Sequence, residues 1–174
     1  MGHSPYPQPT VVIYSGKTGS ACGLVSAAVG PRYCPADHKV YLDTASLSEL
    51  SRRFGAPPSD FTLAYLIVYE VSRHVQTALG TMSKIDEQMR QTDARGRNAL
   101  SVRLELQADC YTGVWTYFMQ KRHRLELGDF KVPAPQAVDE STPYADGAKR
   151  LWWFKRGLAA GDPQQCDTFV VAKP

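Results

Sequence analysis

Apolar residues recur at helical spacing in two long segments of the chain. The first segment runs from Asp60 to Gly80, and its apolar positions are Phe61, Ala64, Val68, Val71, Val75 and Leu79. The second runs from Asn98 to about Arg122, with apolar positions at Val102, Leu106, Cys110, Val114 and Trp115. Intervals of three and four residues place such positions on one helix face, so both segments are predicted to be helices with a buried stripe. We expect the second helix to pack on the first.

Shorter patterns predict the elements between and before these helices. The runs Thr10–Tyr14 and Lys39–Leu42 are rich in β-branched and aromatic residues and favour strands. Residues 46–54 begin with a capping box and predict a short helix. Residues 84–97 are polar and predict a short helix followed by a loop around Gly96.

A last helix is predicted from the cap at Thr142 to the residue before Gly161. We expect it to be anchored in the core by Trp152, Trp153 and Phe154. Together the elements predict an α+β fold that is mainly helical, with a small irregular part containing strands at the N-terminus. No repeat or linker divides the chain, so residues 1–174 are predicted to be a single domain, with residues 1–10 a disordered or added start.

Charge and hydropathy argue against a nucleic-acid-binding protein and against a transmembrane segment in this chain. Twenty basic and seventeen acidic residues give a formal net charge of +3. The charges are scattered along the chain, which argues against nucleic-acid binding. No window approaches the apolar length of a membrane span, so we expect no transmembrane segment in this chain, although an anchor before it is compatible with its start.

The four cysteines, Cys22, Cys34, Cys110 and Cys166, show no CxxC spacing and are expected to form two disulfides. A bridge between Cys22 and Cys34 would stabilise the fold by roughly 3 kcal/mol in the chain-entropy model and would indicate an oxidising compartment. The alternative is four buried thiols in a cytosolic protein.

One stretch resembles a metal-binding motif with altered ligands. In a peptidase helix of the HExxH type, two histidines four residues apart bind zinc and the intervening Glu acts on the bound water. Here the sequence is YEVSRHVQ at residues 69–76, so Glu70 is retained while Tyr69 and Arg73 stand at the histidine positions. Glu105 and Asp109, again four apart, form an ExxxD arrangement on the second long helix.

These runs resemble the neutral zinc metallopeptidase family of bacteria, whose members carry HEVGHHVQ, ELQADC and GDxxxCDTF. This chain has YEVSRHVQ, then ELQADC at 105–110, and GDPQQCDTF at 161–169. The resemblance implies a zincin-like fold and, in many members, an anchored extracytoplasmic domain. It also implies Glu70 as the general base, Glu105 as the third zinc ligand and Asp109 as support for a ligand histidine.

The metal of that family is not expected from these residues. An arginine offers only donors, and a tyrosine could ligate only after losing a proton that normally leaves near about pH 10. His74 does not substitute, because five residues after position 69 it points about 140° away around the helix. From the sequence we therefore expect no metal and no other cofactor.

Arg73 is hypothesised to fill the vacated position and to pair with Glu105, and with Glu70 or Asp109, in which case its removal would destabilise the fold. The alternative places Tyr69 and Arg73 on a solvated helix face. His38 and His123 are expected to be surface residues and not metal ligands.

Three functions fit this pattern. The first is an inactive pseudopeptidase that binds a peptide, a partner protein or a component of the cell envelope outside the cytoplasm. The second is an active hydrolase with a non-standard ligand set around Glu70, Tyr69 and Glu105. The third is a structural protein whose cleft is filled.

Overall fold

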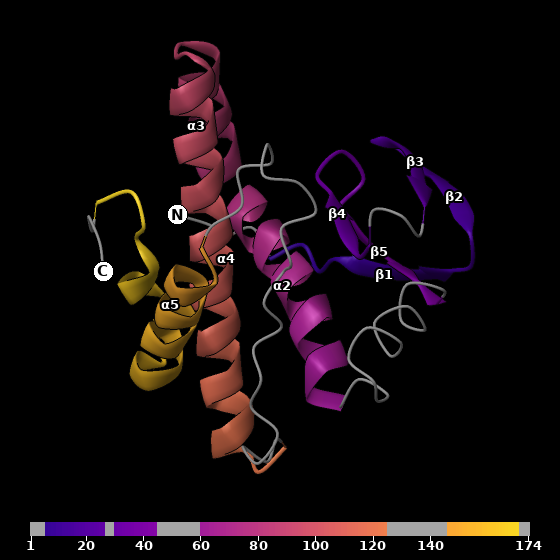
Figure 1. Ribbon diagram of the computed structural model, residues 1–174. Coiled ribbons are helices and arrows are strands. Elements are labelled where there is room, and N and C mark those ends of the chain that lie inside the picture. Colours follow the sequence, from indigo (N-terminus) through magenta and orange to yellow (C-terminus); the bar gives the residue numbers. More distant parts are fainter. Residues whose placement is uncertain (1–5, 27–29, 45–59, 125–145, 171–174) are drawn as a thin grey trace. The chain divides into compact units, whose positions relative to one another are not determined.

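The computed structural model describes residues 6–26, 30–44, 60–124 and 146–170, and of residues 60–62 only the backbone (Figure 1). These residues fall into two compact units, 1–80 and 81–174, each of which is described by itself. The first contains the strands and one helix, and the second is helical. The predicted α+β class, mainly helical with a strand-containing N-terminal part, is confirmed. The predicted helix over 46–54 and the cap at Thr142 lie outside the described residues.

The first unit is built on two small sheets. Strands β1 (Thr10–Tyr14), β5 (Lys39–Asp43) and β4 (Arg32–Cys34) form a sheet in that order, with β5 parallel to β1 and antiparallel to β4. Strands β2 (Lys17–Ser20) and β3 (Gly23–Ser26) form an antiparallel hairpin. Among the described strands β4 pairs with β5 alone, which makes it an edge strand of this sheet. The two predicted strands are thus confirmed as β1 and β5.

Helix α2 (Asp60–Ala78) packs against β4 and β5 (Figure 1). Its predicted start is confirmed, and it ends two residues before the predicted Gly80. The predicted apolar stripe is only partly buried at Ala64, Val68, Val71 and Val75, and Leu79 is 65% exposed. Among residues 63–78, whose side chains are described, the buried ones are Tyr65, Ser72, His74 and Gln76. Ser72 satisfies its hydroxyl by donating to the carbonyl oxygen of Val68 at 2.8 Å. Polar side chains therefore form much of the buried surface of α2.

The second unit contains α3 (Thr81–Arg90), α4 (Ala94–Lys121), α5 (Gly147–Ala160) and the short 3-10 helix η3 (Pro163–Cys166). The predicted loop around Gly96 is wrong, because Gly96 lies in the first turn of α4. The Asp93 side chain caps this helix by accepting a hydrogen bond from Gly96 N at 2.8 Å. The helix therefore begins four residues before the predicted Asn98, and an N-cap outweighs the low helix propensity of glycine.

Helices α4 and α5 lie side by side and make the largest contact in this unit (Figure 1). Their core contains Leu106, Cys110, Val114, Trp153 and Cys166. The helices approach so closely that a Cβ atom on Gly113 would lie 2.1 Å from Phe154 O, and one on Gly157 would lie 2.0 Å from Cys110 O. Glycine is therefore required at both contacts. The predicted anchoring of the last helix by Trp153 and Phe154 is confirmed, since both are buried.

Candidate functional site

Helix α2 carries the residues of the altered motif. Tyr69 and Arg73 are separated by four residues and so project from nearly the same side of the helix. The Tyr69 ring stacks on the ring of buried Tyr65, with centroids 6.3 Å apart and planes inclined by 22°. Tyr69 and Arg73 are both partly buried, so neither lies on a fully solvated face.

The guanidinium of Arg73 has an uncompensated atom. Its Nη1 is buried and has no hydrogen-bond partner in the described part of the chain. The backbone of Arg73 is bonded normally, since its carbonyl oxygen accepts a hydrogen bond from Thr77 Oγ1 at 3.2 Å. Burying a charged donor without an acceptor costs free energy, so an acceptor oxygen placed beside this nitrogen would be stabilising.

Glu70 is held by the sheet. The backbone N–H of Tyr33 donates to Glu70 Oε2 at 2.7 Å. Tyr33 is the central residue of edge strand β4, and its N–H has no strand partner on that side. The carboxylate therefore supplies the acceptor that another strand would supply, which fixes both Glu70 and the strand edge. Its assignment as a general base stays a prediction.

The side chain of the same Tyr33 joins two histidines. Its hydroxyl lies 3.0 Å from His74 Nδ1 and 3.2 Å from His38 Nδ1. His74 is fully buried, and its Nε2 lies 2.6 Å from the carbonyl oxygen of Pro7. The rings of Tyr6, Tyr33 and His38 pack edge-on around His74, with centroids 5.4 to 5.6 Å away. His74 therefore organises the interior of this unit and does not face the motif position.

The partner of Nε2 fixes one proton of His74, and the positions of the others follow for the neutral form of this residue. A carbonyl oxygen only accepts, so Nε2 of His74 must donate to Pro7. In neutral His74, Nδ1 then accepts from the Tyr33 hydroxyl, whose proton is retained because burial raises the pKa of Tyr33. The Tyr33 oxygen in turn accepts from Nδ1 of His38. His38 is exposed, as expected, but it is also part of this chain of hydrogen bonds.

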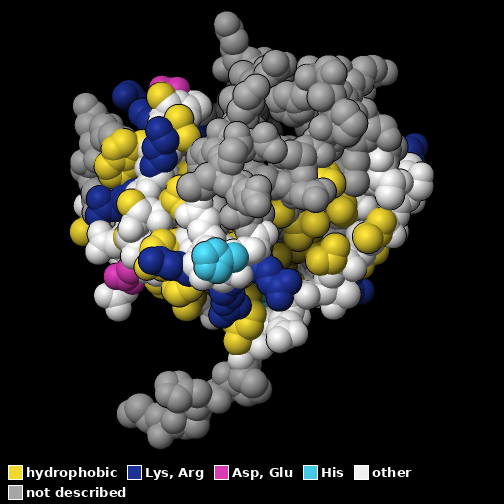
Figure 2. All heavy atoms as spheres, turned by 90° about the horizontal axis from the view of Figure 1, so that it is seen from below, with side chains coloured by type: hydrophobic (Ala, Val, Ile, Leu, Met, Phe, Trp, Pro, Cys, Tyr) yellow, Lys and Arg dark blue, Asp and Glu magenta, His cyan; other side chains and the backbone are white. Residues whose placement is uncertain are grey.

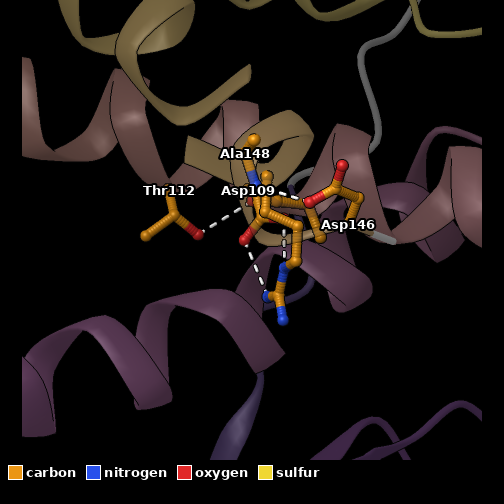
Figure 3. Close-up of polar contacts among 6 residues, drawn as sticks. Asp109, Thr112, Asp146 and Ala148 are labelled. Carbon is orange, nitrogen blue, oxygen red and sulfur yellow. Dashed lines mark hydrogen bonds and ion pairs between the residues drawn. The ribbon is translucent and has the colours of Figure 1, made fainter. Parts of the chain in front are cut away.

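The second motif lies on α4. Asp109 is fully buried and accepts two hydrogen bonds from Arg150 of α5, from Nε to Oδ2 at 2.7 Å and from Nη2 to Oδ1 at 2.8 Å. Figure 3 shows Asp109 at the centre of these contacts, with the cap of α5 beside it, in which Ala148 N donates to Asp146 Oδ1 at 3.0 Å. The cap places Arg150 in the first turn of α5, opposite the acid.

The partner Arg150 was missed by the sequence reasoning, although a signal for it exists. Arg150 lies at helical spacing with Trp153, Phe154 and Gly157, so it belongs to the buried stripe of its helix. A buried arginine requires a buried acid, and Asp109 is the acid on the buried stripe of α4. Glu105, one turn earlier, is partly buried.

The pairing of Arg73 with Glu105 or Asp109 stays a prediction, since these residues belong to different units. What the structure brings together is Tyr69, Glu70 and Arg73 on α2, and Glu105 and Asp109 on α4. Gln107 of the same ELQADC run donates through Nε2 to Cys166 O at 3.1 Å and so holds η3 against α4.

Both disulfides are present. Cys22 pairs with Cys34 in the first unit, and Cys110 pairs with Cys166 in the second. Two disulfides fit an extracellular protein, because such bonds persist in oxidising compartments. In the described segments, no helix has an apolar stretch long enough to cross a bilayer.

The C-terminal end of α4 is basic. Lys121, Arg122, His123 and Arg124 are exposed there, which confirms His123 as a surface residue. Figure 2 shows a histidine among Lys and Arg side chains on the face seen from below. The Lys121 ammonium lies 5.5 Å from the centre of the Tyr117 ring. Cations at a helix C-terminus complement the helix dipole, which is sufficient reason for this run.

Comparison with known proteins places these motifs in a family. A family model described as "Putative neutral zinc metallopeptidase" matches residues 2–169. Uncharacterized protein YpfJ of Escherichia coli (strain K12) is 39% identical over 180 residues, which cover 94% of this chain and 62% of that protein. Uncharacterized protein Rv2575 of Mycobacterium tuberculosis (strain ATCC 25618 / H37Rv) is 32% identical over 193 residues, covering 96% of this chain and 64% of that protein. No solved structure matches the chain.

The expectation that the protein takes no cofactor is wrong, because the matching family is a zinc family and points to zinc. The residues at the histidine positions do not fit that metal, since Arg73 has no lone pair and presents a buried donor nitrogen that has no partner among the described residues. Which atoms of this chain would bind zinc is therefore not given by the family pattern. The match also accounts for the zincin-like part of the predicted fold class. Because the family model covers nearly the whole chain, the chain belongs to the neutral zinc metallopeptidase family.

Proposed function

We propose that this chain is a pseudopeptidase, a member of the zinc metallopeptidase family that no longer hydrolyses peptides and acts by binding. The observation that carries the proposal is the pair Tyr69 and Arg73 on one side of α2, at the positions of the two zinc histidines. The mechanism of the family needs a water activated by zinc beside a glutamate. A guanidinium at a ligand position repels a divalent cation and cannot polarise water in its place.

The position of Glu70 supports the same proposal. A general base must reach the proton that it removes, whereas the Oε2 atom of Glu70 accepts the Tyr33 N–H at 2.7 Å. In this role Glu70 satisfies the edge of β4. This structural role explains the presence of Glu70 without a catalytic one.

The binding partner is proposed to be a peptide, a protein or a component of the cell envelope outside the cytoplasm. The two disulfides support an oxidising location, in the periplasm or beyond. The chain spans a little under two thirds of the length of the curated relatives that it matches. What a protein with the full length of these relatives does is therefore a proposal as well.

A second candidate is an active hydrolase with a non-standard ligand set around Glu70 and Glu105. The observation that favours it is the retention of both acids on the two motif helices, although the histidines have changed.

One assay separates the two candidates. The protein is supplied with zinc and incubated with a mixed peptide pool, and cleavage is followed by mass spectrometry. The matched variants are the triple change Tyr69→His, Ser72→Gly and Arg73→His, which restores the family motif, and the same triple variant with Glu70→Gln.

The proposal predicts intact peptides with the natural chain and cleavage with the restored variant, lost again with Glu70→Gln. Cleavage by the natural chain that disappears in its own Glu70→Gln variant would establish the hydrolase instead.

A further inference from the structure

The residues at the zinc position are complementary to an anion. The Arg73 guanidinium, which only donates, lies on α2 at a position where the family has a lone-pair donor. The family position binds a cation, the zinc ion. With arginine in place of histidine, the same position favours an anion.

Arg73 carries the strongest signal, because its Nη1 atom is buried without an acceptor in the described residues. Buried polar groups in native proteins are nearly always bonded, so an exception points to strain, to function or to a missing ligand. Arg73 as a whole is only partly buried, which leaves part of the side chain in reach of a ligand.

One oxygen of the nearest acid along the helix is bonded to the sheet. Glu70 Oε2 accepts the Tyr33 N–H at 2.7 Å, so this oxygen is directed to the edge of β4. Thr77 Oγ1 donates to the carbonyl oxygen of Arg73 at 3.2 Å.

Carboxylates are the anions that match this donor set. A guanidinium presents two parallel N–H groups to the two oxygens of a carboxylate, and the charge-assisted bonds are about twice as strong as neutral ones. At this position a peptidase generates a new carboxylate when it cuts a chain. A relative that keeps the position but not the chemistry is suited to the product end of a peptide.

We propose that Arg73 binds the C-terminal carboxylate of a peptide or protein partner. This inference rests on the proposed pseudopeptidase function and names the chemical class of its ligand.

The test uses three pools of N-acetylated hexapeptides with the full natural chain in equilibrium dialysis, read by mass spectrometry. The first pool lacks Asp and Glu and ends in a free carboxylate. The second has the same sequences with C-terminal amides. The third is amidated but contains Asp and Glu. The expected result is that the first pool is retained about tenfold more strongly than the second and third.

Variants assign the effect to Arg73. Arg73→Met should abolish the preference for the free carboxylate, and Arg73→Lys, which keeps the charge without the planar fork, should weaken it. Arg95→Met is the matched control, since it removes an exposed arginine at the start of α4 and should leave retention unchanged.

Equal retention of acid and amide pools, absence of retention, or an unchanged preference in Arg73→Met would overturn the inference. Preferential retention of the third pool would overturn the C-terminal assignment in favour of acidic side chains. Shortened peptides would instead refute the pseudopeptidase proposal. Mass spectrometry therefore distinguishes a failure of that proposal from a failure of the carboxylate inference.

Discussion

A fully buried carboxylate on α4 and a partly buried guanidinium on α2 belong to the two motifs, and their surroundings differ. Asp109 on α4 belongs to the intact ELQADC run, and both of its oxygens are bonded to Arg150. Arg73 on α2 belongs to the altered YEVSRHVQ run, and its Nη1 atom is buried without a partner in the described part of the chain. Asp109 is therefore compensated within its own unit, whereas Arg73 keeps a donor without an acceptor among the described residues. The contrast indicates a structural role for Asp109, and the unpaired donor of Arg73 is the basis of the binding role proposed above.

The largest effect is expected from Arg150→Met, which removes the ion pair with Asp109. The change leaves Asp109 fully buried without its two charge-assisted hydrogen bonds, and we expect a loss of roughly 3–5 kcal/mol in the free energy of unfolding. Urea denaturation followed by circular dichroism measures it, with exposed Lys149→Met on the same helix as control. A double variant that also replaces Asp109 with Leu should recover much of the loss. Wild-type stability in Arg150→Met alone would show that the ion pair is not structural.

Each unit contains one disulfide, and the contributions of the two bonds to the free energy of unfolding can be compared. The bridge between Cys110 and Cys166 closes a segment of 56 residues and that between Cys22 and Cys34 one of 12. In the chain-entropy model, replacing each pair with alanine should cost about 4 and about 3 kcal/mol respectively. Chemical denaturation of the two double variants tests this order. A larger loss in the first unit would mean that its fold depends on the bridge for more than chain entropy.

Within the first unit, Tyr33→Phe sharpens the comparison at a smaller scale. It removes the hydroxyl between the two histidines and leaves Nδ1 of buried His74 without its donor, so we expect a loss of about 1–3 kcal/mol. Tyr14→Phe is the matched control, because the Tyr14 hydroxyl is buried without a partner among the described atoms and its removal should cost nothing. Thermal unfolding of the pair gives the answer. Equal losses in both variants would indicate packing effects and not the hydrogen bonds.

Much of the fold follows from the sequence, and the reasons for the errors are physical. The strands β1 and β5 and the helix α2 were recognisable from side-chain periodicity, because such patterns reflect which face is buried. Periodicity failed at Leu79, which is exposed, and at His74 and Gln76, which are buried although polar. Burial of polar residues depends on partners such as Pro7 and Tyr33, which no local pattern reveals.

The candidate site divides in the same way. The family motifs identified Glu70, Arg73 and Asp109, because the spacing of residues on a helix is a local property. The partners of these residues are distant in the sequence: Tyr33 bonds Glu70 across 37 positions and Arg150 bonds Asp109 across 41. Tertiary packing decides such pairs, so they could not be derived from local patterns alone.

The most direct test of the account is the stability of Arg73→Met. Methionine has a similar volume without the charge, and it removes a buried donor that has no acceptor in the described structure. We predict that the free energy of unfolding rises by about 1 kcal/mol or more, as expected when an unpaired polar group retained for binding is replaced by an apolar one. Urea denaturation of the two proteins measures it. A fall in stability would contradict the account, because it would mean that Arg73 compensates buried carboxylates of its own chain.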